Sequence, residues 1–190
     1  MEAGEIVVVS GLPRSGTSMM MAILEAGGVP VLTDGVRRAD EDNPRGYYEF
    51  ERVKRLQDDT GWLPEARGRA VKMVSALLPD LPAEHSYRVV LMQRRMPEIL
   101  ASQRVMLERL GKPTDPAGDG HQAELFERHL ASLRAWMAAR PNFAVLAVDY
   151  NELLARPAEG IAMVDGFLGG GLDTAAMIAV VDRALYRQRA

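Results

Sequence analysis

One cation, two glycines and three hydroxyl side chains lie close together in residues 11–18, which read Gly-Leu-Pro-Arg-Ser-Gly-Thr-Ser. They follow a short β-branched run and precede a helical apolar pattern, so their G-x-x-x-x-G spacing is typical of an anion-binding loop. Glycine allows the backbone to wrap an anion, and amides at a helix N-terminus donate hydrogen bonds to it. A plain strand-to-helix turn needs no such combination of Arg and hydroxyl groups. The predicted phosphate-binding residues are Arg14, Ser15, Gly16, Thr17 and Ser18.

The cation of this loop stands in an unusual place for a nucleotide triphosphatase. Such enzymes carry Lys directly after the second Gly, and this chain has Thr17 there. The cation comes earlier, at Arg14. Residues 13–18 match, one by one, the 5′-phosphosulfate loop Pro-Lys/Arg-Ser-Gly-Thr-Ser/Thr of sulfotransferases that use 3′-phosphoadenosine 5′-phosphosulfate (PAPS). The chain therefore resembles a short, single-domain bacterial member of that family.

A second predicted anion site follows a later strand. Residues 89–92 read Val-Val-Leu-Met, Arg94 comes shortly after them, and Ser102 lies eight residues beyond Arg94. In the sulfotransferases an Arg and a Ser at this spacing bind the 3′-phosphate of PAPS, so the resemblance implies that role here. A phosphate dianion requires such a fixed cation together with a hydroxyl donor. Arg95 is an alternative cation, and an ordinary surface Arg pair with a solvent-facing Ser is the alternative to a site.

Two further segments extend the resemblance over nearly the whole chain. Residues 149–157 are similar to the family's Tyr-Glu-Asp-Leu-Leu segment, and residues 167–169 are similar to its Phe-Leu-Gly ending. We interpret both as structural features that end a strand and pack a helix. The resemblance thus implies a PAPS-dependent sulfotransferase that releases 3′,5′-adenosine bisphosphate (PAP).

The sequence leaves several candidates for the general base. Many cytosolic sulfotransferases carry Lys-Thr-His after a central strand with the His as base, whereas residues 72–74 here read Lys-Met-Val. In members with other acceptors a Glu after the first helix does this work, which implies Glu49. Glu51 fits better as a first-turn helix acid. Lys72 is expected to contact the sulfuryl group, and His121 is a further candidate base.

Transfer of a sulfuryl group requires positive charge near the bridging and equatorial oxygens. Arg14 and the amides of residues 15–18 are expected to supply this charge, so no metal is required. The acceptor is expected to offer a hydroxyl or an amine, either on a small molecule or as an exposed group of a larger one. Residues 35–48 and 111–121 are expected to form the entrance. The predicted catalytic residues are Arg14, Glu49 and Lys72.

Strand-like and helix-like runs alternate along the chain. The expected strands are residues 6–9, 29–32, 70–74, 88–92 and 143–148. The expected helices are residues 17–26, the second half of 47–59, 99–110, 121–139, 157–168 and 174–181. Leu125, Leu130, Leu133 and Trp136 are expected on the inner side of helix 121–139. This alternation predicts an α/β fold, a P-loop-like three-layer α/β/α sandwich with a mostly parallel central sheet.

Composition narrows the class of protein. Of the 190 residues, 47% are hydrophobic and 26% are charged, so we expect a single globular sulfotransferase-like domain over residues 1–190. Lys and Arg total 23 against 26 Asp and Glu, and this net charge of −3 argues against nucleic acid or an acidic membrane as partner. The chain has 0 Cys, which excludes disulfides and Cys-based metal sites. An acidic start and the lack of a long apolar run predict a cytoplasmic protein.

Two other functions compete with sulfuryl transfer. Residues 145–149 read Val-Leu-Ala-Val-Asp, an apolar run plus Asp that resembles the magnesium-binding strand of P-loop nucleotide kinases and ATPases. The lack of Lys at position 17 stands against that function. The second alternative is a degenerate sulfotransferase fold that binds a nucleotide or a partner without catalysis, because the usual His is missing.

Overall fold

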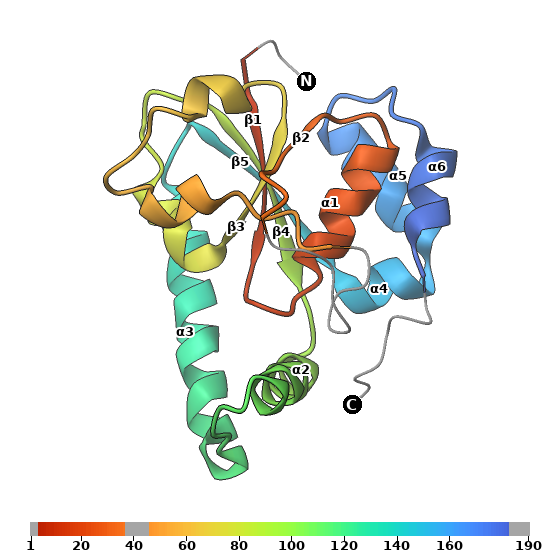
Figure 1. Ribbon diagram of the computed structural model, residues 1–190. Helices are drawn as coiled ribbons and strands as arrows, with labels where there is room; N and C mark the ends of the chain where they lie inside the picture. The colour runs from red at the N-terminus through yellow and green to blue at the C-terminus, as the bar shows by residue number, and fades with distance from the viewer. Residues whose placement is uncertain (1–3, 37–45, 183–190) are drawn as a thin grey trace.

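The structure, a computed structural model, describes residues 4–36 and 46–182, whose strands form one parallel sheet (Figure 1). The strand order is β2-β3-β1-β4-β5, and every neighbouring pair is parallel. The strands are β1 (Ile6–Gly11), β2 (Val31–Leu32), β3 (Ala70–Val74), β4 (Tyr87–Gln93) and β5 (Phe143–Asp149). The predicted α/β class and the parallel sheet are therefore confirmed.

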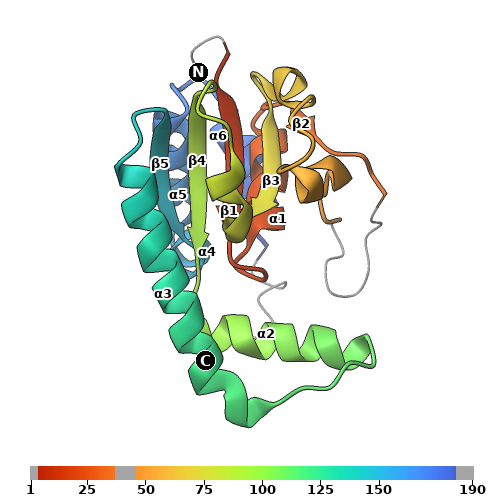
Figure 2. The same cartoon turned by 90° about the vertical axis from the view of Figure 1, so that its left-hand side faces the viewer.

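Helices cover both faces of this sheet and one of its edges. The α-helices are α1 (Thr17–Ala26), α2 (Met96–Arg109), α3 (Asp119–Ala138), α4 (Tyr150–Ala155), α5 (Pro157–Phe167) and α6 (Thr174–Val180). The 3-10 helices are η1 (Glu51–Arg55), η2 (Leu63–Ala66), η3 (Ser75–Asp80) and η4 (Pro116–Gly118). Helices α1, α5 and α6 lie on one face and α3 on the other, while α2 crosses the edge where the strands end (Figures 1 and 2). The three layers predicted from the alternation are present.

The core is divided by the sheet into two apolar clusters. Ile6 and Val8 of β1 belong to the cluster under α3 and the 3-10 helices, whereas Val7 and Val9 belong to the cluster under α1, α5 and α6. Successive side chains of a strand point to opposite faces, so a central strand needs apolar residues at every position. This is why the β1 sequence is apolar without alternation.

Three local expectations differ from the structure. Helix α4 was not predicted, because it is a single short element that begins directly after β5 and is capped by the Asp149 side chain. The helical pattern in residues 47–59 forms only η1. Leu125 was expected on the inner side of its helix but is 40% exposed, because the first half of α3 extends past the sheet (Figure 2). Leu133, in the second half of α3, packs into the core.

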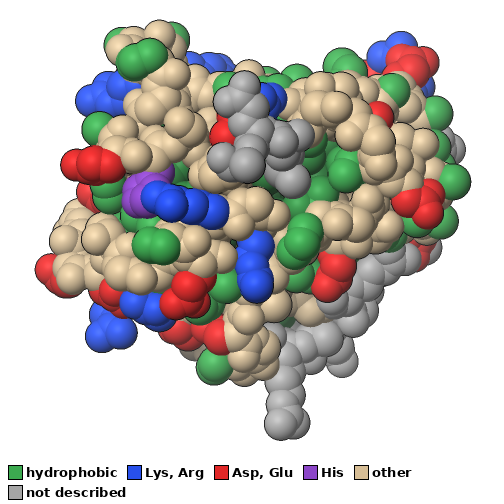
Figure 3. All heavy atoms as spheres, turned by 90° about the horizontal axis from the view of Figure 1, so that it is seen from above, with side chains coloured by type: hydrophobic (Ala, Val, Ile, Leu, Met, Phe, Trp, Pro, Cys, Tyr) green, Lys and Arg blue, Asp and Glu red, His purple; other side chains and the backbone are tan. Residues whose placement is uncertain are grey.

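The carboxyl ends of the strands meet at one edge of the sheet because all pairs are parallel. The loop after β1, Lys72 near the end of β3 and Arg94 after β4 therefore lie at that same edge. The opposite edge, where the strands begin, carries acidic and basic side chains scattered among each other (Figure 3). Among the residues that the structure describes, no helix combines the length and the apolar character needed to cross a membrane.

Candidate functional site

The loop between β1 and α1 forms a tight backbone cradle. Arg14 has φ 74° and Gly16 has φ 99°, so the chain turns twice through the left-handed region before α1 begins. A Cβ at Gly16 would lie 2.5 Å from the ring of Tyr150, so a side chain has no room there. The first N–H groups of a helix have no acceptor within it, and those of α1 open toward this loop. The loop has the geometry of an anion site.

Ser15 differs from the other loop residues in where its hydroxyl lies. Its side chain is 1% exposed, and its Oγ has no hydrogen-bond partner among the described residues. The Oγ lies against the backbone of Gly11, where an added Cβ would be 2.5 Å away. The amide of Ser15 donates to the carbonyl oxygen of Leu12 at 3.1 Å, so this residue closes the turn of the loop, and its small side chain fills the space under it.

The fold brings the two predicted phosphate motifs into direct contact. Arg14 Nε donates a hydrogen bond of 2.8 Å to Ser102 Oγ, although the two residues are 88 positions apart. Arg94 Nη1 donates to the carbonyl oxygen of Arg14 at 3.1 Å across 80 positions. Gln103 Nε2 lies 3.4 Å from the carbonyl oxygen of Pro13. These contacts hold the loop apex against the start of α2.

Arg94 is held by a buried network that the sequence did not reveal. Its Nε donates to Glu98 Oε2 at 2.8 Å, and the Glu98 side chain is 0% exposed. Asn151 Nδ2 also donates to Glu98 Oε1 at 2.9 Å. The guanidinium carbon of Arg94 lies 4.6 Å from the ring centroid of Tyr150. Arg94 precedes α2 and Glu98 lies in its first turn, so their spacing of four was the available sequence signal. Asn151 and Tyr150 come from α4 and gave no such signal.

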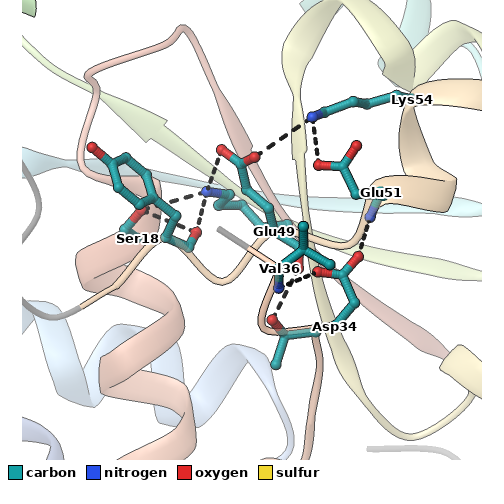
Figure 4. Close-up of polar contacts among 9 residues, drawn as sticks. Ser18, Asp34, Val36, Glu49, Glu51 and Lys54 are labelled. Carbon is teal, nitrogen blue, oxygen red and sulfur yellow. Dashed lines mark hydrogen bonds and ion pairs between the residues drawn. The ribbon is translucent and has the colours of Figure 1, made fainter. Parts of the chain in front are cut away.

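Lys72 forms a second cationic centre beside the loop. Its ammonium group donates to the carbonyl oxygen of Tyr47, lies 3.5 Å from Ser18 Oγ and 3.8 Å from Glu49 Oε1 (Figure 4). The Glu49 side chain is 19% exposed. A carboxylate, an ammonium group and a loop hydroxyl from three separate segments therefore point toward one another.

Glu49 also faces a second ammonium group. Lys54 Nζ lies 3.7 Å from Glu49 Oε2 and 2.6 Å from Glu51 Oε1. The hydrogen bond to Glu51 and the charge of Glu49 raise the pKa of Lys54 above its ordinary value. Glu51, the alternative base, thus pairs with Lys54 at the surface, whereas Glu49 lies between two cations (Figure 4).

The backbone around Glu49 is tied to the end of the segment after β2. The carbonyl oxygen of Glu49 accepts from Thr33 Oγ1 at 2.9 Å and from the amide of Asp34 at 3.2 Å. The Asp34 carboxylate accepts from the amide of Glu51 at 2.5 Å. These bonds fix the position of Glu49 without using its carboxylate.

Most of the predicted site residues line a single cavity of about 420 Å³. Those that line it are Arg14, Gly16, Thr17, Ser18, Glu49, Lys72, Arg94 and Ser102. Those that do not are Ser15, Glu51, Arg95 and His121. The side chain of Arg95 is 59% exposed, and His121 is exposed on α3, so the geometry favours Arg94 and Glu49 over these alternatives.

The cavity continues over the sheet edge into both layers. On one side lie Met19, Ala22 and Val180, which we call the α1 lobe; Met19 and Val180 pack against the α1-side core. On the other side lie Phe50, Val53, Met73 and Leu77, which we call the η1 lobe and which belong to or pack against the core of the opposite face. The polar residues of the phosphate loop stand between two apolar lobes.

Of the two segments predicted to form the entrance, only one contributes a described residue to the lining of the cavity. Residues 37–45 lie outside the described residues, and Tyr47 lines the cavity. No residue of 111–121 lines it, because this segment leads from the far end of α2 into α3. Asp149, the candidate magnesium ligand of a kinase, instead accepts hydrogen bonds from the amides of Asn151 and Glu152 and does not line the cavity.

Comparisons with known proteins agree on the architecture. No protein-family model matches the sequence, and no curated protein matches it. Among solved structures, a sulfotransferase domain from the curacin biosynthetic pathway superposes with a TM-score of 0.57 at 16% identity, covering 96% of this chain and 79% of that one. The sulfotransferase domain of the Synechococcus PCC 7002 olefin synthase gives 0.56 at 16% identity, covering 97% and 80%.

A third similar structure contains ligands. It is a retinol dehydratase in complex with androsterone and the inactive cofactor PAP, with a TM-score of 0.52 at 16% identity, and the superposition covers 93% of this chain and 63% of that one. At these identities the likeness concerns the fold, which is that of sulfotransferases.

Proposed function

We propose that this chain is a PAPS-dependent sulfotransferase that moves a sulfuryl group to the hydroxyl or amine of an acceptor and releases PAP. The observation that carries the proposal is the contact between Arg14, Ser102 and Arg94 in one cavity. Two anion-binding motifs that are distant in sequence meet there, as a donor with phosphates at both its 3′ and 5′ positions requires.

The residues present fit such a donor. The amides at the start of α1, with the hydroxyls of Thr17 and Ser18, would hold the 5′-phosphosulfate. Ser102 and Arg94 would hold the 3′-phosphate, and Arg14 lies beside Ser102, between the two positions. The α1 lobe offers an apolar wall next to the loop for the nucleoside. When bound, the donor supplies an activated sulfuryl group on a good leaving group.

The acceptor side of the reaction needs a base and a cation, and Glu49 and Lys72 would supply them. Glu49 accepts the proton of the attacking hydroxyl or amine while the acceptor atom forms its bond to sulfur and the bond from sulfur to the bridging phosphate oxygen breaks. Lys72 lies 3.8 Å from Glu49 and 3.5 Å from Ser18, so its charge is placed to stabilise the oxygens that become more negative. The proton ends on Glu49 and the negative charge on PAP.

Calorimetric titration with PAP in EDTA tests the donor half of this proposal. Wild-type protein should bind PAP without magnesium, and Ser102→Ala should bind it about 10-fold or more weakly, because a hydrogen bond to a charged group is lost. Ser86→Ala, which changes an exposed serine outside the cavity, is the matched control. Binding of ATP with magnesium in place of PAP would favour a kinase and contradict the proposal.

A further inference from the structure

The two outer strands of the sheet differ in how they are protected from pairing with another chain. β2 has only two residues and comes directly after Pro30, and both shortness and proline protect an edge. β5 has seven residues, and residues 143–148 contain neither proline nor a charged side chain (Figure 2). A long, uncharged outer strand is a template for a further strand.

The backbone groups of β5 that face away from the sheet belong to alternate residues. The amide of Tyr87 donates to the carbonyl oxygen of Asn142, which sets the phase of the ladder between β4 and β5. Every second residue of a parallel strand turns its N–H and C=O groups toward a given neighbour, so the even-numbered residues of β5 bond to β4. Val145 and Ala147 turn their backbone groups outward, and both residues are exposed, Val145 by 39%. Two residues of β5 therefore present a donor and an acceptor to a partner strand.

One antiparallel register satisfies both residues and uses the whole strand. We infer that two copies of this chain associate by pairing their β5 strands antiparallel about a two-fold axis at Leu146. Val145 of each copy then exchanges two hydrogen bonds with Ala147 of the other, and the larger side chain of one lies beside the smaller of the other. The pairing joins five strands from each copy into one sheet and directs the two cavities toward opposite edges of it.

Helix α3 carries two opposite charges that fit the same axis. Arg134 lines a groove of about 320 Å³ together with Val145 and Ala147, so its side chain faces the β5 edge. Glu127 lies two turns earlier, at almost the same angle around the helix, and both charged residues are exposed. The two-fold axis makes the two α3 helices antiparallel, which brings Arg134 of each copy opposite Glu127 of the other. This charge complementarity favours a second copy of the chain as the partner.

The positions of the two charges along α3 agree with an axis at Leu146. The rings of Trp136 and Phe143 lie 5.1 Å apart, so this part of α3 is level with the start of β5, and the two elements run in opposite directions (Figure 2). Leu146 lies about 10 Å along the strand from Phe143. At a rise of about 1.5 Å per residue, α3 reaches that level about seven residues before Trp136. This point is close to the middle of the segment between Glu127 and Arg134, so one axis serves both the strands and the helices.

Sedimentation equilibrium of the full chain tests the association. We expect wild-type protein to form a species of twice the chain mass of 20.9 kDa. Val145→Lys should shift it to the monomer, because a lysine in the middle of an edge strand opposes pairing. Leu110→Lys, which changes a 59% exposed residue beyond the end of α2, should stay dimeric. Wild-type protein that remains monomeric at every soluble concentration would overturn the inference.

A charge exchange tests the contact between the helices. Arg134→Glu should raise the dissociation constant of the dimer by about 10-fold or more, because it places carboxylates of the two copies opposite each other. Adding Glu127→Arg to this variant restores opposite charges and should restore most of the affinity. A double variant that dissociates as readily as Arg134→Glu alone would contradict the axis.

Disulfide formation tests the register of the strands. The chain has 0 Cys, so a single introduced cysteine is its only thiol. Two copies of Leu146 that face each other across the axis form a pair without hydrogen bonds, whose Cα atoms come within disulfide range. Under mild oxidation Leu146→Cys should form a covalent dimer faster than Leu110→Cys, although Leu110 is 59% exposed. Equal or faster cross-linking of Leu110→Cys would overturn the inferred pairing.

Discussion

The end of the cavity that we propose for the phosphates and the end that we propose for the acceptor are built in different ways. The phosphate end uses backbone amides, a left-handed turn and a buried ion pair, all held between β1, α1 and α2. The acceptor end uses side chains from η1, β3 and η3, with Glu49 and Lys72 at the boundary. The backbone thus sets the geometry of the proposed phosphate end, whereas individual side chains set the shape of the proposed acceptor end.

Glu49→Gln should have the largest effect, and this effect should be confined to turnover. Loss of the base should lower kcat by about 10²–10⁴-fold, while PAP affinity stays near the wild-type value. Steady-state kinetics with a saturating acceptor and calorimetry with PAP measure the two quantities. Glu51→Gln is the control, because Glu51 does not line the cavity, and it should keep most of the activity. A large loss of kcat in Glu51→Gln, with little loss in Glu49→Gln, would identify Glu51 as the base instead of Glu49.

Arg14→Ala should lower both the rate of transfer and the affinity for PAP. Removing this cation should lower kcat/KM by about 10²–10³-fold, because charge that develops on the transferred group loses a partner. PAP affinity should fall as well, since Arg14 lies beside Ser102. Arg95→Ala, which changes a 59% exposed side chain outside the cavity, should have little effect in either assay. Similar losses in both variants would contradict the assigned roles.

Glu98→Ala should reveal how the phosphate end is supported. It leaves Arg94 without its buried partner, so unfolding in urea should show a loss of about 3 kcal/mol in stability. Glu159→Ala breaks a pair with Arg156 in which the two side chains are 59% and 67% exposed, and it should leave the urea midpoint almost unchanged. If the two variants unfold at the same urea concentration, the network around Arg94 does not stabilise the fold.

The smallest effect concerns a surface contact near the acceptor end. Arg52 of η1 donates to Asp59 at 2.8 Å, and this hydrogen bond lowers the pKa of Asp59. A lowered folded-state pKa means that the contact stabilises the protein above the unfolded value near 3.8 and is lost as pH falls through the folded value. Asp59→Asn should therefore be slightly less stable than wild type at pH 6, and the difference should shrink at about pH 3. A difference that grows toward acid would contradict this account.

The sequence predicted the elements whose signals are local. Helix α1 has the predicted bounds because a glycine loop precedes it, Gly27 and Gly28 follow it, and its apolar face is broad. The contact between Arg14 and Ser102 was not predicted, since no local pattern links residues 88 positions apart. The spacing of Arg94 and Ser102 predicted a pair of residues that both line the cavity, but it did not reveal that Arg94 is also buried beside Glu98.

Other parts of the candidate site could not be predicted, because their residues form no distinctive sequence pattern. Phe50 and Leu77 have the pattern of ordinary core residues, and only the packed structure shows that part of their surface faces the cavity. The tie between Glu49 and Thr33 joins two loop segments, which no periodicity describes. Residues 111–121 were expected at the entrance because they are rich in Gly and Pro, but the direction of α2 carries them away from it.

The most direct test of the central claim is turnover of PAPS in EDTA with a panel of hydroxyl and amine acceptors. Chromatography would follow conversion of PAPS to PAP, and mass spectrometry would detect the acceptor with one added SO3 group. The account predicts PAP and sulfated acceptor in equal amounts, with the rate strongly reduced in Glu49→Gln. Tight PAP binding with PAPS left intact beside every acceptor would contradict it and identify the chain as a binding protein with a sulfotransferase fold.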